Sequence, residues 1–264
     1  LSRPDPEPPL ETTITAEYAL IGGGYTGLWT AYFLKKKQPD ANVVLIEAQH
    51  TGHGASGRNG GWLMGTLEGL SAFADDQGKL PAAARDQLNA LVTRAGRTLA
   101  AERIECDFYH GGCVMAAARH DSQVRHAHRT LSHFQQLGFT EDDYCWLSPE
   151  ALTTRMQVAN PGGAVFTPHV ARVHPAKLVT GLARVVKSLG VRIFEHTRAN
   201  HIAAGHIHCD RGNVKAEHIV VATEGYSEAG NPLHRKMIPV QTGMVATEPL
   251  SEAQWSGVGF HDNE

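Results

Sequence analysis

The sequence predicts an α/β protein, in which a parallel sheet built on a βαβ unit is interrupted by an inserted lobe of helices and strands. Three observations lead to this prediction. An apolar strand, a glycine-rich turn, a helix and a second apolar strand follow one another over residues 18–46. The same alternation returns over residues 175–222, whereas residues 82–137 carry long helical patterns around a single strand. Alternating strands and helices favour a parallel sheet, and the change of pattern indicates an α+β insertion.

The first βαβ unit follows a proline-rich leader. Residues 1–15 are expected to be extended, because four prolines block both helix and ladder hydrogen bonds. Tyr18–Ile21 then predicts a short buried strand, Gly22–Gly27 a turn, and Leu28–Lys37 an amphipathic helix that ends before a Gln-Pro pair. Val43–Ile46 predicts the second strand. A unit of this length is right-handed, with parallel strands.

The middle of the chain departs from this alternation, and the last part returns to it. Helical patterns over residues 82–104 and 121–137 flank an apolar strand at Cys113–Ala118. The later elements are a helix at Pro175–Leu189, a strand at Val191–Glu195, a hairpin turning at Gly205 and Gly212, and a buried strand at His218–Ala222. We therefore expect a leader over residues 1–15, a discontinuous nucleotide domain over 16–80 and 168–230, and a second, partial domain over 81–167 and 231–264.

Composition excludes several classes of protein. A chain of 264 residues with 42% hydrophobic content can bury a real core. Its net charge of −3 leaves no basic field for nucleic acid, and no apolar run approaches the roughly 18 to 20 residues of a membrane span. The four cysteines lack CxxC spacing, and the histidine pairs lack a nearby third ligand, so we expect no metal site. We expect a cytoplasmic protein that binds a small molecule.

The glycines at residues 22–27 match the GxGxxG pattern of Rossmann-type dinucleotide-binding folds. Alone, this pattern is as often a structural turn. Here it directly follows a strand and opens a helix, so Gly22 permits the tight turn, Gly24 the approach of a pyrophosphate, and Gly27 the packing of helix on strand. Glu47 ends the second strand, where a carboxylate accepts hydrogen bonds from a ribose diol. This carboxylate favours FAD or NAD over NADP.

A dense run of small residues extends from Gly52 to Trp62. Such a run can present consecutive backbone amides to an anion, and Arg58 adds a positive charge. An NAD-dependent dehydrogenase has no need of this segment, although composition alone is also typical of a flexible surface loop. Trp62, the last residue of the run, is a candidate aromatic wall for a flavin.

These residues resemble a known family. The segments GGGYTGLWTAYFL, VVLIEA and GHGASGRNGGW are similar to the N-terminal signature of the D-amino-acid oxidase (DAO) superfamily of FAD proteins, and to its gamma-glutamylputrescine oxidase-like branch. HIVVATEGYS and VATEPLSEAQW continue the likeness in the same order. The resemblance implies a Rossmann-type FAD-binding domain with an inserted α+β substrate lobe. It also implies that the chain stops before the last third of such proteins.

The resemblance, together with the motifs, assigns the cofactor site but no catalytic residue. Ala199 takes the place of a valine that the family carries beside the adenine, and Ala222, Thr223 and Gly225 match a later loop against the cofactor. The expected FAD-binding residues are Gly22, Gly24, Tyr25, Thr26, Gly27, Glu47, Ala48, Gly54, Ala55, Ser56, Arg58, Asn59, Gly60, Gly61, Trp62, Ala199, Ala222, Thr223 and Gly225.

The activity that the resemblance implies is oxidation of the C–N bond of an amine or amino acid. Hydride passes to the flavin, and the resulting imine hydrolyses. Oxygen is one expected electron acceptor. Two alternatives stay open: an NAD-dependent Rossmann dehydrogenase, and an FAD-binding fragment without catalysis.

Overall fold

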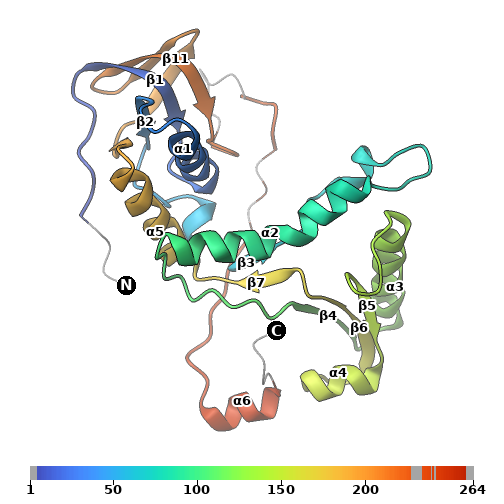
Figure 1. Cartoon of the computed structure of the whole chain (residues 1–264). Coiled ribbons are helices and arrows are strands. Elements are labelled where there is room, and N and C mark those ends of the chain that lie inside the picture. The colour runs from blue at the N-terminus through green and yellow to red at the C-terminus, as the bar shows by residue number, and fades with distance from the viewer. Residues whose placement is uncertain (1–4, 227–233, 239, 241, 260–264) are drawn as a thin grey trace. The chain divides into compact units, whose positions relative to one another are not determined.

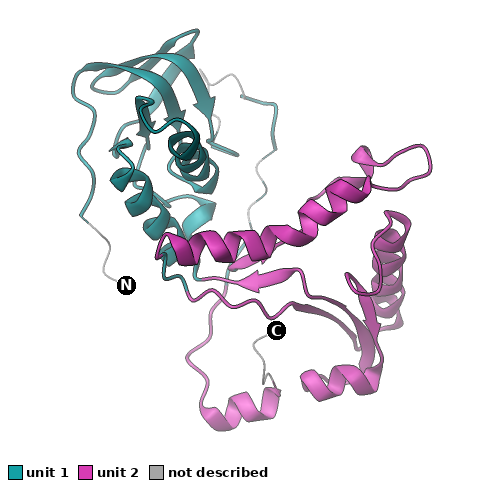
Figure 2. Ribbon diagram, in the orientation of Figure 1, with its two compact units in different colours: residues 1–60, 104–106, 174–244 teal, residues 61–103, 107–173, 245–264 magenta. Residues whose placement is uncertain are grey.

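The computed structural model of the chain describes residues 5–226, 234–238, 240 and 242–259. Figure 1 follows the chain through its elements, and Figure 2 shows that they group into two compact units. Unit 1 contains residues 1–60, 104–106 and 174–244, and unit 2 contains residues 61–103, 107–173 and 245–264. The α/β fold with parallel strands that the sequence predicts is confirmed in unit 1.

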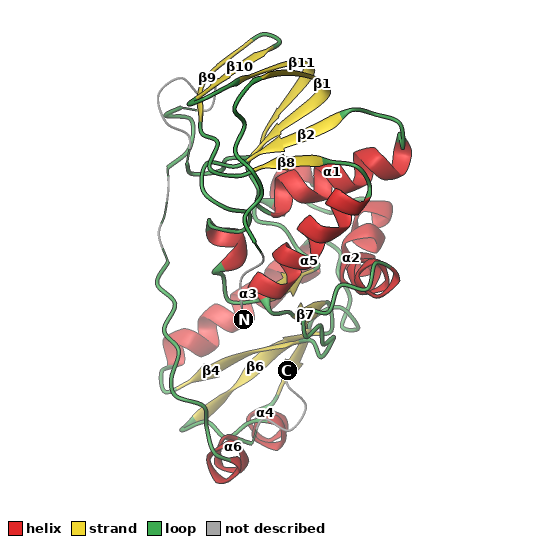
Figure 3. Ribbon diagram, turned by 90° about the vertical axis from the view of Figure 1, so that its left-hand side faces the viewer, coloured by secondary structure: helices red, strands yellow, loops and turns green. Residues whose placement is uncertain are grey.

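Unit 1 is built on a six-stranded sheet in the order β8-β2-β1-β11-β10-β9 (Figure 3). β1 lies between β2 and β11 and is parallel to both, and β2 pairs in parallel with β8. β10 is antiparallel to β11 and to β9, as expected for the hairpin through Gly205 and Gly212. The strands are β1 (Thr13–Ile21), β2 (Val43–Ile46), β8 (Arg192–Phe194), β9 (Ala199–Ala203), β10 (His206–Cys209) and β11 (Asn213–Val221).

Two helices cover one face of this sheet, α1 (Tyr25–Lys37) and α5 (Pro175–Ser188) (Figure 3). α5 begins with proline at its first position, and the His174 Nδ1 atom accepts a hydrogen bond from the Lys177 amide. Apolar side chains at Leu178, Leu182 and Val185 recur at helical spacing and are buried. The helices therefore stay on the sheet because each has an apolar face to bury.

The opposite face of the sheet carries a second apolar core, and the leader lies beside it. Leu10 is buried in this core together with Ile21 and Ile46. The Leu10 amide donates to the Thr197 hydroxyl at 3.0 Å, and the Glu7 amide donates to the Glu195 carboxylate at 3.0 Å. The described leader residues are thus held to unit 1 by buried and half-buried hydrogen bonds.

Element boundaries differ from the sequence expectations at both ends of the central strand pair. β1 begins at Thr13 rather than Tyr18, because Thr13–Ala16 pair with Asn213–Ala216 of β11. The strand expected to be buried at His218–Ala222 is not: His218 is exposed and the residues that follow it are half-buried. β10 pairs only with Asn213–Lys215. In the described chain, the edge of β11 that faces away from β1 is therefore unpaired over His218–Val221. That part of the prediction was wrong.

Unit 2 contains a three-stranded antiparallel sheet in the order β4-β6-β5, with β3 paired to β7. Helix α3 (Asp121–Gln136) packs on β4 and β6 around buried residues such as Ala127, Leu131 and Val165. Because β3 pairs with β7, residues 61–80 and 168–173 group with this unit rather than with the nucleotide domain. The strands are β3 (Trp62–Met64), β4 (Cys113–Ala118), β5 (Cys145–Leu147), β6 (Pro161–Thr167) and β7 (Val170–Arg172).

The helices of unit 2 are α2 (Ala82–Ala101), α3 (Asp121–Gln136), α4 (Pro149–Arg155) and α6 (Glu252–Val258), with a short 3-10 turn at Leu70–Phe73. Among the residues that the structure describes, no helix combines the length and apolar character needed to cross a membrane.

A polar cluster in unit 2 centres on Asp143. One carboxylate oxygen accepts a hydrogen bond from the Asn89 amide group and lies 3.0 Å from the His169 Nε2 atom, and the other accepts from the amide and hydroxyl of Thr140. Burial alone would raise the pKa of Asp143, but the Thr140 and His169 contacts outweigh it and hold the pKa below its ordinary value. The cluster therefore stabilises the fold while Asp143 is ionised.

Asp143→Asn should make unfolding easier at pH 7 by about 1 to 3 kcal/mol, because hydrogen bonds to a charged acceptor are lost. Because the pKa of Asp143 is lower in the folded chain than its ordinary value of 3.8, the ionised carboxylate stabilises the folded chain at pH values above 3.8. This stabilisation is lost as the pH falls through the pKa of the folded state. Denaturant unfolding at pH 7 and below pH 4 measures the difference. Asp86→Asn, at an exposed position of α2, is the control. An Asp143→Asn deficit that persisted unchanged at the lowest pH would contradict this account.

Gly27 controls the packing of α1. A Cβ atom at this position would lie 2.0 Å from the Gly22 carbonyl oxygen, so the helix could not stay against the turn. Gly27→Ala should destabilise the chain by about 3 kcal/mol or more, at the upper end of overpacking effects. Thermal unfolding measures this, with Gly257→Ala, where the added methyl meets nothing within 4 Å, as the control. Equal melting temperatures for the two variants would refute the close approach.

Candidate functional site

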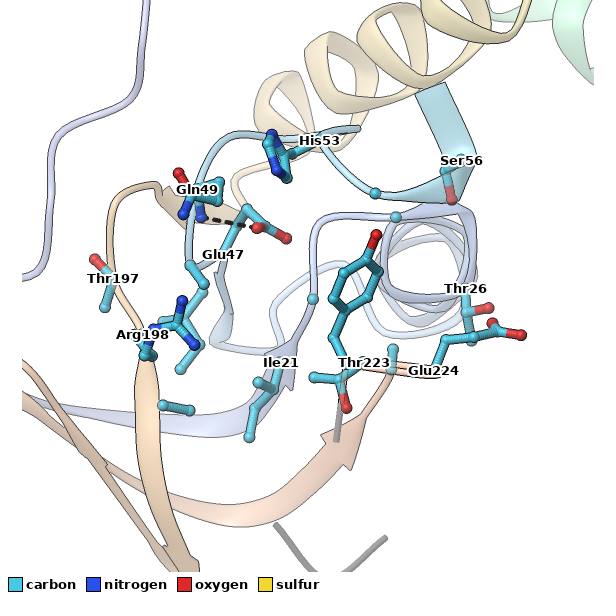
Figure 4. Close-up of a pocket in the computed structure, with 18 of the residues that line it drawn as sticks. Ile21, Thr26, Glu47, Gln49, His53, Ser56, Thr197, Arg198, Thr223 and Glu224 are labelled. Carbon is cyan, nitrogen blue, oxygen red and sulfur yellow. Dashed lines mark hydrogen bonds between the residues drawn. The ribbon is translucent and has the colours of Figure 1, made fainter. Parts of the chain in front are cut away.

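A cavity of about 320 Å³ lies in unit 1 at the carboxyl end of the parallel strands (Figure 4). Ile21 at the end of β1 and Ile46 at the end of β2 form part of its wall, and Ala222 follows directly after β11. In open α/β sheets, ligands bind in this position. The expected site residues that line the cavity are Gly22, Gly24, Tyr25, Thr26, Glu47, Ala48, Gly54, Ala55, Ser56, Ala199, Ala222 and Thr223.

The glycine turn brings three backbone segments together at one end of the cavity. Gly22 has φ +113°, and a Cβ atom there would lie 2.4 Å from the Ala222 carbonyl oxygen. A Cβ atom on Gly24 would lie 2.8 Å from the Ser56 hydroxyl. Side chains are thereby excluded where the turn faces β11 and the loop around Ser56. The result is a cradle whose surface is mostly backbone.

The N-terminus of α1 opens onto this cradle. Gly24 caps the helix in an extended conformation and supplies no side-chain acceptor, and no acidic residue lies in the first turn. The Tyr25 amide donates to the Ser56 hydroxyl at 2.9 Å. A helix of 13 residues concentrates positive partial charge at this end, and no carboxylate of its own first turn offsets that charge. Such a terminus suits a phosphate group.

Glu47 lies in the cavity wall next to the glycine turn, half-buried beyond the last residue of β2. One carboxylate oxygen accepts from the Gly23 amide at 2.7 Å, and the other accepts from the Gln49 amide at 2.9 Å, drawn dashed in Figure 4. The carboxylate is therefore fixed in place by the backbone. Because each carboxylate oxygen accepts more than one hydrogen bond, both oxygens keep capacity for a hydroxyl of a ligand.

The loop of small residues that follows Gly52 folds back on itself through internal hydrogen bonds. Ala55–Gly57 form a 3-10 turn, and the Asn59 amide group donates to the carbonyls of Ala55 and Ser56. The Arg58 side chain is exposed and donates to the Gly54 carbonyl at 3.4 Å. Neither Arg58 nor Asn59 lines the cavity: the Arg58 side chain turns back on the loop, and the Asn59 side chain bonds to the loop and to Tyr25.

Five further expected residues also lie outside the cavity lining. Gly27 packs behind the turn, against Gly22. Gly60 and Gly225 belong to unit 1 without lining the cavity. Gly61 and Trp62 fall in unit 2, where Trp62 begins β3 and is 68% exposed.

Several lining residues were not expected from the sequence. The polar ones are Gln49, His53, Thr197, Arg198, Asn200, Glu224 and Tyr226. Most of them lie within a few residues of a predicted site residue or directly after a strand of the parallel sheet. A search of the residues that follow each predicted parallel strand would have found Gln49, Arg198 and Glu224.

Tyr25 is the titratable group of the cavity with a marked shift. Burial raises its pKa to about 12, although a hydrogen bond with Asn59 acts in the other direction. Its hydroxyl donates to the Pro175 carbonyl at 3.1 Å. The phenol therefore stays protonated near neutral pH and acts as a donor.

No set of three histidine, cysteine, aspartate or glutamate side chains in the described part of the chain is arranged to hold a metal ion. The cavity thus presents backbone amides at the N-terminus of α1 and a fixed carboxylate beside the glycine turn.

Known proteins resemble this chain both in sequence and in structure. In sequence, the chain is 28% identical to gamma-glutamylputrescine oxidoreductase of Escherichia coli (strain K12), over 92% of this chain and 57% of that protein. It is 27% identical to the probable oxidoreductase OrdL of Haemophilus influenzae (strain ATCC 51907 / DSM 11121 / KW20 / Rd), over 93% of this chain and 58% of that protein. The chain thus spans less than two thirds of the length of these relatives.

Among solved structures, glycine oxidase from Geobacillus kaustophilus aligns with a TM-score of 0.65 and 21% identity, over 84% of this chain and 58% of that one. This likeness supports the fold. The sequence model of the DAO family, described as FAD dependent oxidoreductase, matches residues 17–263. The family indicated by the glycine motifs is therefore confirmed, and the chain belongs to the DAO family of FAD-dependent oxidoreductases.

Proposed function

We propose that the cavity of unit 1 binds FAD and that the protein oxidises the C–N bond of an amine or amino acid. The observation that carries the proposal is the convergence of three features in one cavity: a glycine cradle, a helix N-terminus with no acidic residue in its first turn, and a fixed carboxylate. A dinucleotide needs all three, because its pyrophosphate binds amides and its ribose hydroxyls bind a carboxylate. The family assignment favours FAD and speaks against an NAD-dependent dehydrogenase.

The cradle fits the phosphates because side chains are excluded there. A Cβ atom at Gly22 or Gly24 would collide with Ala222 or Ser56, so only glycine leaves the backbone open at these positions. Gly22, Gly24 and the first turn of α1 would hold the pyrophosphate, and Glu47 would hold the adenosine ribose. Ala222 and Thr223, which follow β11, would close the side of the cavity.

Bound FAD would supply the hydride acceptor: the substrate loses a hydride from the carbon beside nitrogen and a proton from nitrogen, and the imine hydrolyses to a carbonyl compound and an amine or ammonia. The part of the chain described here would bind and orient the cofactor. Tyr25 does not serve as a base, because its raised pKa keeps the phenol protonated. The names of the relatives, a gamma-glutamylputrescine oxidoreductase and a glycine oxidase, support a substrate with an amine nitrogen.

A second candidate is FAD binding without turnover. It is favoured by the lining of the cavity, whose described residues provide groups for cofactor binding while none is assigned a catalytic role. Under this alternative the cavity would bind FAD as tightly, but amines would not reduce it.

We expect the purified chain, incubated with FAD and freed of excess, to show the visible absorption of oxidised flavin. Anaerobic addition of a panel of amines and amino acids should bleach this absorption with one substrate class, and recovery of colour in air would identify oxygen as an acceptor. A colourless chain would contradict FAD binding. A coloured chain that no substrate bleaches would favour the second candidate.

Glu47→Gln should weaken FAD binding by about 10- to 100-fold, because one oxygen that accepts a backbone amide becomes a donor and the charge is lost. Quenching of flavin fluorescence on titration measures the dissociation constant. Glu217→Gln, at an exposed position of β11, is the matched control and should bind as the unaltered chain does. Unchanged affinity in Glu47→Gln would remove the ribose assignment.

A further inference from the structure

Arg198 is a lining residue that the cofactor motifs do not account for. It is half-buried and lies in the cavity wall on the side of Glu47, whereas Thr26, Ser56 and Glu224 lie on the other side (Figure 4). If the pyrophosphate binds at the helix N-terminus and Glu47 binds the adenosine ribose, Arg198 lies on the adenosine side of the dinucleotide, away from the phosphates. An arginine in this place requires an explanation other than phosphate binding.

The segment before Arg198 is held firmly against the end of β2. The His196 amide donates to the Gln49 carbonyl at 2.8 Å, and the Thr197 amide donates to the Glu47 carbonyl at 2.9 Å. His196 has φ +49°, which turns the chain sharply after β8. The backbone at Arg198 therefore has a fixed position relative to the Glu47 carboxylate.

The side chain of Thr197 secures the same turn from within. It is 3% exposed, accepts from the Leu10 amide and donates to the Glu195 carbonyl at 2.9 Å. Glu195 is also buried, and its carboxylate accepts from the Thr51 amide at 2.7 Å. The polar groups of both side chains are thus already hydrogen-bonded within the protein, and Arg198 follows Thr197 in the cavity lining.

The chemistry of arginine selects a planar aromatic ligand at this position. A guanidinium is planar and weakly hydrated, and it stacks on aromatic rings more readily than an ammonium group does. Ala199, the next lining residue, offers only a methyl group, so Arg198 is the larger side chain of this adjacent pair in the wall. A 2′-phosphate on the ribose is disfavoured by the fixed Glu47 carboxylate beside it.

The geometry points to Arg198 as a recognition residue for the adenine ring of FAD, stacking on the base while Glu47 binds the ribose next to it. This inference rests on the proposed binding of FAD. It assigns the adenosine end of the cofactor to two residues that follow neighbouring strands, β2 and β8.

The test uses the FAD-free chain with Arg198→Ala, Arg198→Lys and Arg211→Ala. Arg211→Ala is the matched control, since Arg211 is exposed between β10 and β11 and does not line the cavity. Flavin fluorescence gives the dissociation constant of FAD, and displacement of FAD gives those of ADP and of pyrophosphate, which lacks the base. Melting temperatures identify any variant that fails to fold.

We expect Arg198→Ala to weaken FAD and ADP by the same factor, roughly 3- to 30-fold, with pyrophosphate unchanged. Arg198→Lys should lose most of the same affinity, because lysine keeps the positive charge but lacks the planar guanidinium group. Equal weakening of ADP and pyrophosphate would mean a phosphate contact and would overturn the inference, as would full affinity in Arg198→Lys or Arg198→Ala. If the unaltered chain binds no FAD, the proposed function itself fails; if it binds and only Arg198 has no effect, the inference alone fails.

Discussion

Three stretches of backbone meet at the end of β1 at distances that leave no room for side chains. The Gly22 carbonyl would lie 2.0 Å from a Cβ atom on Gly27, and the Ala222 carbonyl would lie 2.4 Å from a Cβ atom on Gly22. This close approach holds β1, α1 and the end of β11 together. The candidate site is the surface that these three segments leave exposed. Fold and site are therefore subject to the same steric constraint, because relaxing it would move the helix N-terminus out of the cavity.

A second constraint fixes the part of the cavity wall around Glu47, and it depends on carboxylates that bind backbone amides. Glu47 holds the Gly23 and Gln49 amides, while Glu195 holds the Glu7 and Thr51 amides. β2 and β8 are parallel neighbours, so these two carboxylates follow adjacent strand ends. One faces the cavity and the other organises the leader and the following loop. The polar groups that shape the site are thus already paired within the protein, which limits rearrangement on binding.

The sequence predicted what depends on local pattern and missed what depends on pairing across the sheet. The strands Val43–Ile46 and Cys113–Ala118 were placed correctly, since both are short apolar runs with clear ends. The N-terminal extension of β1 was missed because residues Thr13–Ala16 are strand only through pairing with β11, some 200 residues later. For the site, GxGxxG and Glu47 have fixed spacing. Arg198 has no such spacing, because its place follows from the order of strands and from the left-handed turn at His196.

The charges lining the cavity bear on how a dinucleotide could be held. Glu47 and Glu224 contribute carboxylates, and Arg198 contributes a cation on the side of Glu47. The two negative charges of a pyrophosphate would therefore depend on the backbone amides and the dipole of α1 more than on a basic side chain. Arg58, which the sequence offers for that task, turns back to the Gly54 carbonyl. Amide hydrogen bonds are directional and require a fixed geometry, and the steric fit at Gly22, Gly24 and Gly27 supplies that geometry.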